Sequence, residues 1–388
     1  MSEEAAARIT WTRSRMRMLA SIRDDFSRTR PFEDITIGMS LHVEPKTVVL
    51  LETLAAGGAT IVGTGNHGST QDDMVAFLND SGMTIHGARD DTEAQHAGHI
   101  ERILDAGPQI LLDNGGDLAA RAAERGQAGA ITGGTEETTS GGFRLRESYA
   151  GRIPFPVIVI NDSPLKAIAE NRHAVGQSAV ESFQRITNLQ VVGRRVVVIG
   201  YGWCGRGVAQ YLRALGARVG IVELDEMKAF EAAYDGYRVG PLETLLPWAD
   251  AVITATGRPG VLTGGSFDLL RDGAVLANIG HFPFEIDVPA LAEAASAVTP
   301  VSTGIDDYEL SAGRTVSLLT EGRMFNLGGA SPKGNSIESM DLGFALQSLS
   351  LERVATDRSA LVAGPQRVPE DIERLLARRS VELLGSAD

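Results

Sequence analysis

The chain has 388 residues, which is enough for two or three domains that each bury a core. Its formal net charge of −14 argues against a nucleic-acid partner, because nucleic-acid binding normally needs a basic surface. The single cysteine, Cys204, excludes an internal disulfide. The sequence shows no signal peptide and no apolar run near the ~20 residues of a membrane span. We therefore expect a cytoplasmic protein without membrane contact.

Short apolar runs alternate with amphipathic stretches in the first half of the chain. The pattern predicts strands at residues 35–39, 59–64, 83–87, 109–113, 130–133 and 156–160, with helices such as 47–56 and 71–79 between them. Strands that alternate with helices indicate βαβ units, and therefore a parallel sheet.

The same alternation starts again in the second half. Strands are predicted at residues 195–199, 218–223, 251–254 and 274–278, with a helix over 207–215. Two such series predict an α/β protein with two parallel-sheet domains, the second of Rossmann type over residues 171–331. Helices predicted at 340–352 and 369–384 should pack back onto the first domain, which would then comprise residues 1–170 and 332–388.

A glycine-rich motif follows the strand at 195–199. Gly200, Gly202 and Gly205 fit the GxGxxG pattern, which lets the backbone approach a pyrophosphate at the start of a helix. Glu223 ends the next strand, where an acidic residue would accept hydrogen bonds from ribose hydroxyls and repel a 2′-phosphate. The motif therefore predicts NAD rather than NADP; the alternative is a structural glycine-rich turn.

Polar residues stand repeatedly at the predicted carboxyl ends of strands, where parallel sheets bind ligands. They are His42, Asn66, Asp113 with Asn114, residues 136–139, Asn161 with Asp162, and Asn278 with His281. One such residue alone is more often a cap or a turn residue. Six positions from two sheets indicate a cleft between domains.

These motifs resemble the S-adenosylhomocysteine hydrolase family, in order, over roughly residues 30–345. The segments that carry the resemblance are 161–171 (with Lys166 and Asn171), the glycine loop, 278–287, 321–328, and further upstream 41–42, 51–54, 69–72, 112–117 and 136–139. The resemblance implies an enzyme in which bound NAD oxidises the 3′-hydroxyl carbon of a nucleoside thioether. The ketone acidifies the 4′ proton, the thiol leaves C5′, water adds, and the ketone is reduced again.

The resemblance also implies site residues. Lys166 and Asn171 would act at the oxidised hydroxyl, Glu137 would hold the ribose hydroxyls, and His281 would contact the 3′ oxygen. His42 would lie near C5′ and assist the leaving group or water. The NAD site would include Thr138, Thr139, Asn278 and Asn326 beside Gly200, Gly202, Gly205 and Glu223.

The sequence departs from the family pattern at several positions. Asn114 stands where the family has an aspartate, and an amide cannot carry a proton as a carboxylate can. Glu170 replaces an aspartate next to Lys166. At the nucleoside the family's threonine and glutamate become Glu44 and Lys46, and Lys333 lies near its Gly-His-Pro segment. The oxidation residues are kept, whereas base-recognition and C5′ positions differ.

The family's C-terminal tail, which reaches the NAD of a neighbouring subunit, has no counterpart after the helix predicted at 369–384. We therefore expect a homodimer that holds NAD less tightly than the family's tetramers. Leu342, Ala345, Leu346 and Leu349 form an apolar stripe that could mediate association or pack within the chain.

Three hypotheses follow. The first is a hydrolase of this type that acts on a modified or different nucleoside thioether. The second is the ordinary adenosylhomocysteinase with a changed pocket. The third is a catalytically weak NAD-binding regulator, against which the retained Lys166, Asn171, Glu137 and His281 argue.

Overall fold

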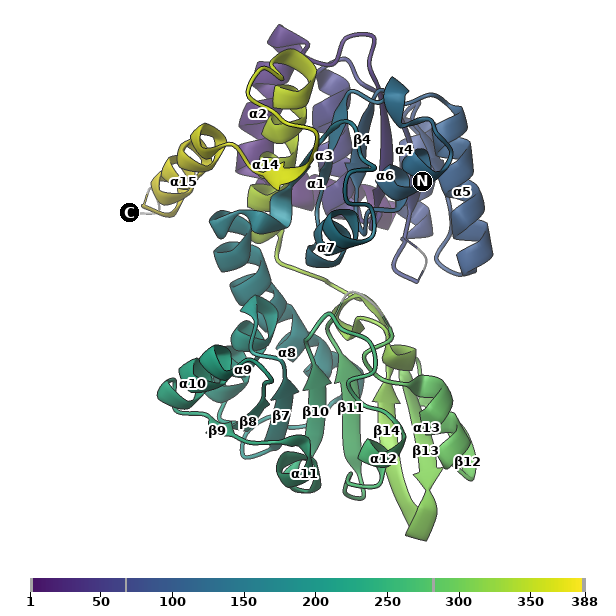
Figure 1. Ribbon diagram of the computed structural model, residues 1–388, viewed down its shortest axis with the longest axis vertical. Helices are drawn as coiled ribbons and strands as arrows, with labels where there is room; N and C mark the ends of the chain where they lie inside the picture. Colours follow the sequence, from purple (N-terminus) through teal and green to yellow (C-terminus); the bar gives the residue numbers. More distant parts are fainter. Residues whose placement is uncertain (1–2, 67, 281–282, 386–388) are drawn as a thin grey trace. The chain divides into compact units, whose positions relative to one another are not determined.

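The computed structural model describes residues 3–66, 68–280 and 283–385. The chain divides into two compact units, which Figure 1 colours along the sequence. Unit 1 comprises Met1–Ala167 and Ile337–Asp388, and unit 2 comprises Ile168–Ser336. Within the described residues, no helix is both long and apolar enough to cross a membrane.

Unit 1 contains a seven-stranded parallel sheet in the order β15-β6-β5-β4-β1-β2-β3. The strands are β1 (Thr36–Leu41), β2 (Thr60–Gly65), β3 (Thr84–His86), β4 (Ile110–Asp113), β5 (Gly133–Glu136), β6 (Pro156–Val159) and β15 (Gly364–Arg367). The helices are α1 (Glu3–Arg15), α2 (Arg17–Thr29), α3 (Pro45–Ala56), α4 (Asp72–Asp80), α5 (Glu93–Asp105), α6 (Asp117–Glu124), α7 (Thr139–Glu147), α14 (Ile337–Thr356) and α15 (Glu370–Gly385).

Helix α14 is buried on nearly all sides and packs against α2, α3, β4 and β5. Asp341 joins it to the start of α2, because its carboxylate accepts hydrogen bonds from the backbone N–H groups of Met18 at 2.8 Å and Leu19 at 2.9 Å. The sequence did not decide whether the apolar stripe on this helix mediates association or packs within the chain. Two of its residues, Leu342 and Leu346, are buried within unit 1. This stripe is therefore an intrachain packing face.

The strand predicted at 130–133 lies three residues further along the chain, at β5. Residues Ala128–Ala130 form a short 3-10 helix instead. Gly133 and Gly134 are the first two residues of β5. The neighbouring strand leaves no room for a side chain at Gly134, since a Cβ there would lie 2.5 Å from the carbonyl oxygen of Leu111. The shift makes Glu136 the last residue of β5 and Glu137 the first residue after it.

Unit 2 contains an eight-stranded sheet in the order β12-β13-β14-β11-β10-β7-β8-β9. Its strands are β7 (Arg195–Ile199), β8 (Arg218–Val222), β9 (Arg238–Val239), β10 (Ala251–Thr254), β11 (Ala274–Asn278), β12 (Ala297–Ser302), β13 (Ile305–Leu310) and β14 (Arg314–Leu319). Its helices are α8 (Val175–Thr187), α9 (Trp203–Ala214), α10 (Glu226–Tyr234), α11 (Leu242–Leu245), α12 (Gly264–Phe267) and α13 (Val288–Ala294).

The parallel part of this sheet has the Rossmann strand order, which confirms the predicted fold class. From β7 the chain continues outward to β8 and β9, then returns to β10, β11 and β14 on the other side of β7. The antiparallel strands β12 and β13 extend one edge, and the sequence analysis did not predict them.

Candidate active site

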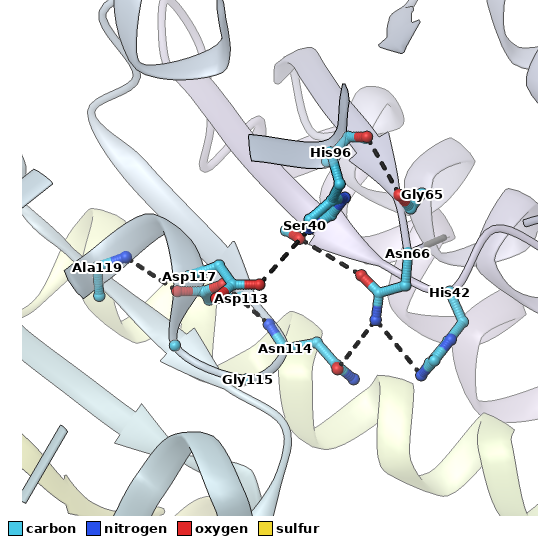
Figure 2. A network of polar contacts seen from close by, with 12 residues as sticks. Ser40, His42, Gly65, Asn66, His96, Asp113, Asn114, Gly115, Asp117 and Ala119 are labelled. Carbon is cyan, nitrogen blue, oxygen red and sulfur yellow. Dashed lines mark hydrogen bonds and ion pairs between the residues drawn. The ribbon is translucent and has the colours of Figure 1, made fainter. Parts of the chain in front are cut away.

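Four polar residues directly follow four neighbouring strands of unit 1. They are His42 after β1, Asn66 after β2, Asn114 after β4 and Glu137 after β5. Because parallel strands end at the same edge of a sheet, these side chains lie close together, and Figure 2 shows the part of this network around Asn66 and Asn114.

A continuous series of side-chain contacts joins these residues. Asn66 Nδ2 lies 3.5 Å from His42 Nε2 and 3.2 Å from Asn114 Oδ1. Asn114 Nδ2 in turn donates to Glu137 Oε2 at 2.9 Å, and Lys166 Nζ lies 3.3 Å from Glu137 Oε1. The structure thus brings together four of the residues expected at the reacting end of a nucleoside.

The charges of Glu137 and Lys166 depend on each other. Only 7% of Glu137 and 4% of Lys166 is exposed, so water screens the pair little. Burial by itself would raise the pKa of Glu137, but Lys166, Asn114 and His42 outweigh that effect and lower it. Glu137 is therefore an ionised hydrogen-bond acceptor at neutral pH.

A second ion pair lies at the start of α3. Lys46 Nζ lies 3.0 Å from Glu44 Oε2, and the two side chains are 5% and 13% exposed. Burial raises the pKa of Glu44, Lys46 opposes that rise, and the nearby charge of Glu137 adds to it. The departures at positions 44 and 46 are thus coupled to each other and lie within electrostatic reach of Glu137.

Behind the site, a pair of buried carboxylates holds the turn that carries Asn114. Glu136 accepts hydrogen bonds from the backbone N–H groups of Gly115 and Gly116, and Asp113 accepts from those of Asn114 and Ala119. Burial, with the charge of Asp117 adding to it, raises the pKa of Asp113 to about 6. Burial and the charge of Asp113 raise the pKa of Glu136 to about 8. The sequence showed both residues at strand ends but not that they form a pair.

Lys166 begins a nine-residue π-helix, Lys166–Ala174. In a π-helix the N–H of each residue bonds to the carbonyl five positions earlier, so Lys166 and Asn171 occupy successive turns of one face. Such helices are rare and are frequently found at functional sites. Glu170 on the same helix is 6% exposed.

The glycine loop of unit 2 fits a dinucleotide. Gly200 has a φ of +98°, and a Cβ on Gly205 would lie 2.0 Å from the Gly200 carbonyl oxygen, so neither position tolerates a side chain. Gly202 precedes α9 and supplies no capping side chain, which leaves the first N–H groups of the helix to a phosphate. Glu223 directly follows β8, and its carboxylate accepts from the backbone N–H of Tyr201 at 2.7 Å.

Two buried asparagines differ in how far the protein occupies their amides. Asn278 Oδ1 accepts from Gly280 N–H at 2.8 Å and its Nδ2 donates to the carbonyl oxygen of Gly322 at 2.9 Å, so this amide shapes the loop around it. Asn326 Nδ2 donates to Ser178 Oγ at 3.1 Å. Its Oδ1 is buried and has no partner among the described residues, as expected where a bound amide such as that of nicotinamide would donate.

Other predicted site residues are placed without a contact that tests their role. Thr138 caps α7, with Oγ1 accepting from Gly141 N–H at 2.9 Å, and Thr139 is exposed in the first turn. Lys333 is exposed in the loop before α14. His281 lies outside the described residues.

Comparisons with known proteins cover both units. Residues 171–332 match the family model of the S-adenosyl-L-homocysteine hydrolase NAD-binding domain, and residues 2–128 match the S-adenosyl-L-homocysteine hydrolase model. The chain is 42% identical to S-inosyl-L-homocysteine hydrolase of Methanopyrus kandleri, over 97% of this chain and 90% of that protein. It is 40% identical to adenosylhomocysteinase of Archaeoglobus fulgidus, over 98% and 95%. A further S-inosyl-L-homocysteine hydrolase, from Methanothermobacter thermautotrophicus, is 39% identical over 99% and 93%.

Proposed function

Because the chain belongs to the S-adenosylhomocysteine hydrolase family, whose members use NAD to hydrolyse S-adenosyl- or S-inosyl-homocysteine, we propose that its preferred substrate carries a 6-oxopurine, and specifically hypoxanthine. This choice selects the first hypothesis, a changed nucleoside, over an adenosylhomocysteinase with a changed pocket. The catalytically weak regulator is the third candidate, and the linked set His42, Asn114, Glu137 and Lys166 argues against it, because a pure binding module does not need that set.

The observation that carries the proposal is the buried pair of Lys46 and Glu44. An ammonium group only donates hydrogen bonds, and an ionised carboxylate only accepts them. Hypoxanthine presents an acceptor at O6, which complements the ammonium group of Lys46, and a donor at N1–H. Adenine presents the reverse, a donor amino group at C6 and an acceptor at N1. A mismatched pair at the base edge would leave buried polar groups unsatisfied, at about 1–3 kcal/mol each.

The proposed chemistry assigns a role to each unit. In unit 2, Gly200, Gly202, Gly205 and Glu223 would hold NAD with Asn278 and Asn326, and unit 1 would add Thr138 and Thr139. When bound, NAD supplies the hydride acceptor for the 3′ carbon.

In unit 1, Glu137 would accept hydrogen bonds from the ribose hydroxyls, and Lys166, with Asn171 on the same helix face, would exchange the 3′-hydroxyl proton. Glu170 would adjust the charge around Lys166 from the same helix. His42 would serve the C5′ step. The resemblance adds His281 at the 3′ oxygen and Lys333 near the base.

Steady-state kinetics on S-inosyl-, S-guanosyl- and S-adenosyl-homocysteine test the base preference. We expect kcat/KM for the inosyl compound to exceed that for the adenosyl compound at least tenfold, since ~1.4 kcal/mol corresponds to a factor of ten. Lys46→Glu should lower kcat/KM for the inosyl compound and reduce this ratio. Arg28→Glu, the same charge reversal at an exposed position of α2, is the control. Faster turnover of the adenosyl compound by the unmodified enzyme would overturn the proposal and favour the ordinary adenosylhomocysteinase.

We also propose that the enzyme is a homodimer. The buried stripe on α14 does not supply the interface, because it packs inside unit 1. Helix α10 supports an interface better, since Met227 is 74% and Tyr234 80% exposed, and Leu224 just before it is 93% exposed. We infer from these exposed apolar side chains that α10 contributes to the interface.

A further inference from the structure

The hydrogen bonds between Glu137 and His42 have a direction that the chemistry of their groups fixes. Glu137 is an ionised carboxylate and only accepts, so the Asn114 atom 2.9 Å from it is the amide nitrogen. The Asn114 oxygen then faces Asn66, which donates to it through Nδ2 at 3.2 Å. Each amide orientation follows from the one before it.

The direction of these hydrogen bonds also determines which proton the imidazole of His42 carries. The donor nitrogen of Asn66 also lies 3.5 Å from His42 Nε2, so a proton on Nε2 would oppose it. On the other side of the ring, Nδ1 lies 2.6 Å from Ser69 Oγ. Ser69 donates its own proton to the carbonyl oxygen of Asn66 at 3.1 Å, which leaves its lone pairs for a proton on Nδ1. Asn66 and Ser69 favour the same tautomer.

We propose that Ser69, Asn66 and Asn114 are positioning residues that keep a proton on Nδ1 of His42, so that Nε2 is the nitrogen that gives and takes the proton of the C5′ step. This role rests on the proposed function. In elimination, the electron pair left at C4′ by loss of the 4′ proton forms the C4′=C5′ bond and the C5′–S bond breaks. The imidazolium form of His42 gives its Nε2 proton to the sulfur and is left neutral, with its proton on Nδ1. In hydration, Nε2 takes a proton from water as its oxygen bonds to C5′ and the C4′=C5′ electron pair moves toward the 3′ carbonyl.

Asn114 gives this arrangement a property that an aspartate would not. A carboxylate at position 114 would face Glu137 at 2.9 Å, and two carboxylates so close must share a proton. With the amide, the direction of the hydrogen bonds does not change with pH while Glu137 is ionised. The charged groups near this series are the pair Glu137–Lys166, the pair Glu44–Lys46 within electrostatic reach of Glu137, and the pair His96–Asp117 (Figure 2).

Nitrogen-15 NMR of the NAD-loaded enzyme, with labelled histidine, reads the tautomer directly. The His42 signals are assigned by comparison with His42→Gln. In the neutral imidazole we expect a protonated Nδ1 and an unprotonated Nε2, and Ser69→Ala should give a mixture of tautomers. A neutral imidazole with its proton on Nε2 in the unmodified enzyme would overturn the proposal, even if the Ser69 variant failed to fold. This result does not depend on which base the substrate carries.

Rapid mixing with the inosyl and adenosyl substrates separates positioning from general damage. Ser69→Ala should slow thiol release by roughly 10- to 100-fold, less than the 10²–10⁴ expected for losing the base itself, while NADH formation in the first turnover stays unchanged. Ser69→Thr should restore thiol release. In Asn114→Asp, the pH profile of the rate of thiol release should show one additional ionisation. The control Ser27→Ala removes an exposed hydroxyl on α2. Equal slowing of NADH formation and thiol release by Ser69→Ala would show a merely structural role and overturn the proposal.

Discussion

Glu137 has two partners of different chemistry, the ammonium group of Lys166 and the amide of Asn114. Its place near the end of β5 could be predicted, although the strand itself was predicted three residues too early. Its partners could not, since Asn114 lies 23 residues before it and Lys166 29 residues after it. The sequence did not predict the contact of Ser69 with His42 either. Ser69 lies in a loop after β2, where no periodic pattern shows the direction of a side chain.

At this scale the sharpest test is Lys166→Met, which keeps much of the side-chain volume and removes the charge. Because a positioned proton-transfer group is worth roughly 10²–10⁴ in rate, we expect substrate oxidation to fall by that factor while NAD binding persists. Stopped-flow absorbance of NADH measures the oxidation, and fluorescence titration measures NAD binding.

Arg28→Met, at an exposed position of α2, removes a positive charge away from the site and is the control, which should behave as the unmodified enzyme. Unchanged NADH formation in Lys166→Met would remove this lysine from the reaction.

Among the elements, β4 and β5 decide how the site is held. Their last residues, Asp113 and Glu136, are register partners in the sheet, so two carboxylates face one buried region. The alternation of strands and helices predicted both strands. This pattern placed β5 three residues too early, because glycines at 133 and 134 are typical of the end of a strand. The sequence does not show that Leu111 approaches Gly134 so closely that only glycine fits there.

The raised pKa values of Asp113 and Glu136 make unit 1 less stable as pH rises. A folded-state pKa above the unfolded value contributes stability that is fully present below the unfolded pKa and is lost as pH rises through the folded pKa. For these residues the loss falls between about pH 4 and pH 8, given folded values of about 6 and about 8. We expect the urea midpoint of unfolding to decrease from pH 5 to pH 8.

Glu136→Gln tests the origin of this decrease. The variant should be less stable at pH 5, because its NH₂ group opposes one of the backbone donors, at about 1–3 kcal/mol. Its urea midpoint should then change less with pH than that of the unmodified enzyme. Glu147→Gln, at an exposed position of α7, should keep the original slope. Parallel pH profiles for all three proteins would show that other groups cause the decrease.

For the whole molecule, the two-sheet α/β organisation could be predicted because each βαβ series has its own periodicity. The helices α1 and α2, the strand β15 and the antiparallel pair β12–β13 could not. Strand β15 has the sequence Gly-Pro-Gln-Arg, which lacks the alternation and the β-branched residues of a strand, and only its pairing with β6 makes it one.

The proposed homodimer belongs to this scale. Sedimentation velocity should give a dimer for the unmodified enzyme, and Tyr234→Glu on α10 should shift it toward monomer because a charge would be buried at the interface. Trp11→Glu, an equally drastic change at a side chain of α1 that is 58% exposed, should leave the dimer intact. A stable tetramer, or a dimer unaffected by Tyr234→Glu, would contradict the proposal.

Unit 1 is built from two stretches of chain, and its outermost strand β15 and buried helix α14 come from the second. Unit 2 is one uninterrupted stretch between them. During synthesis on the ribosome, which runs from the N-terminus, the Rossmann sheet is therefore complete while β6 still has an unpaired edge and β5 lacks its cover by α14. The nascent chain can take up its cofactor before the part that binds the nucleoside has finished folding.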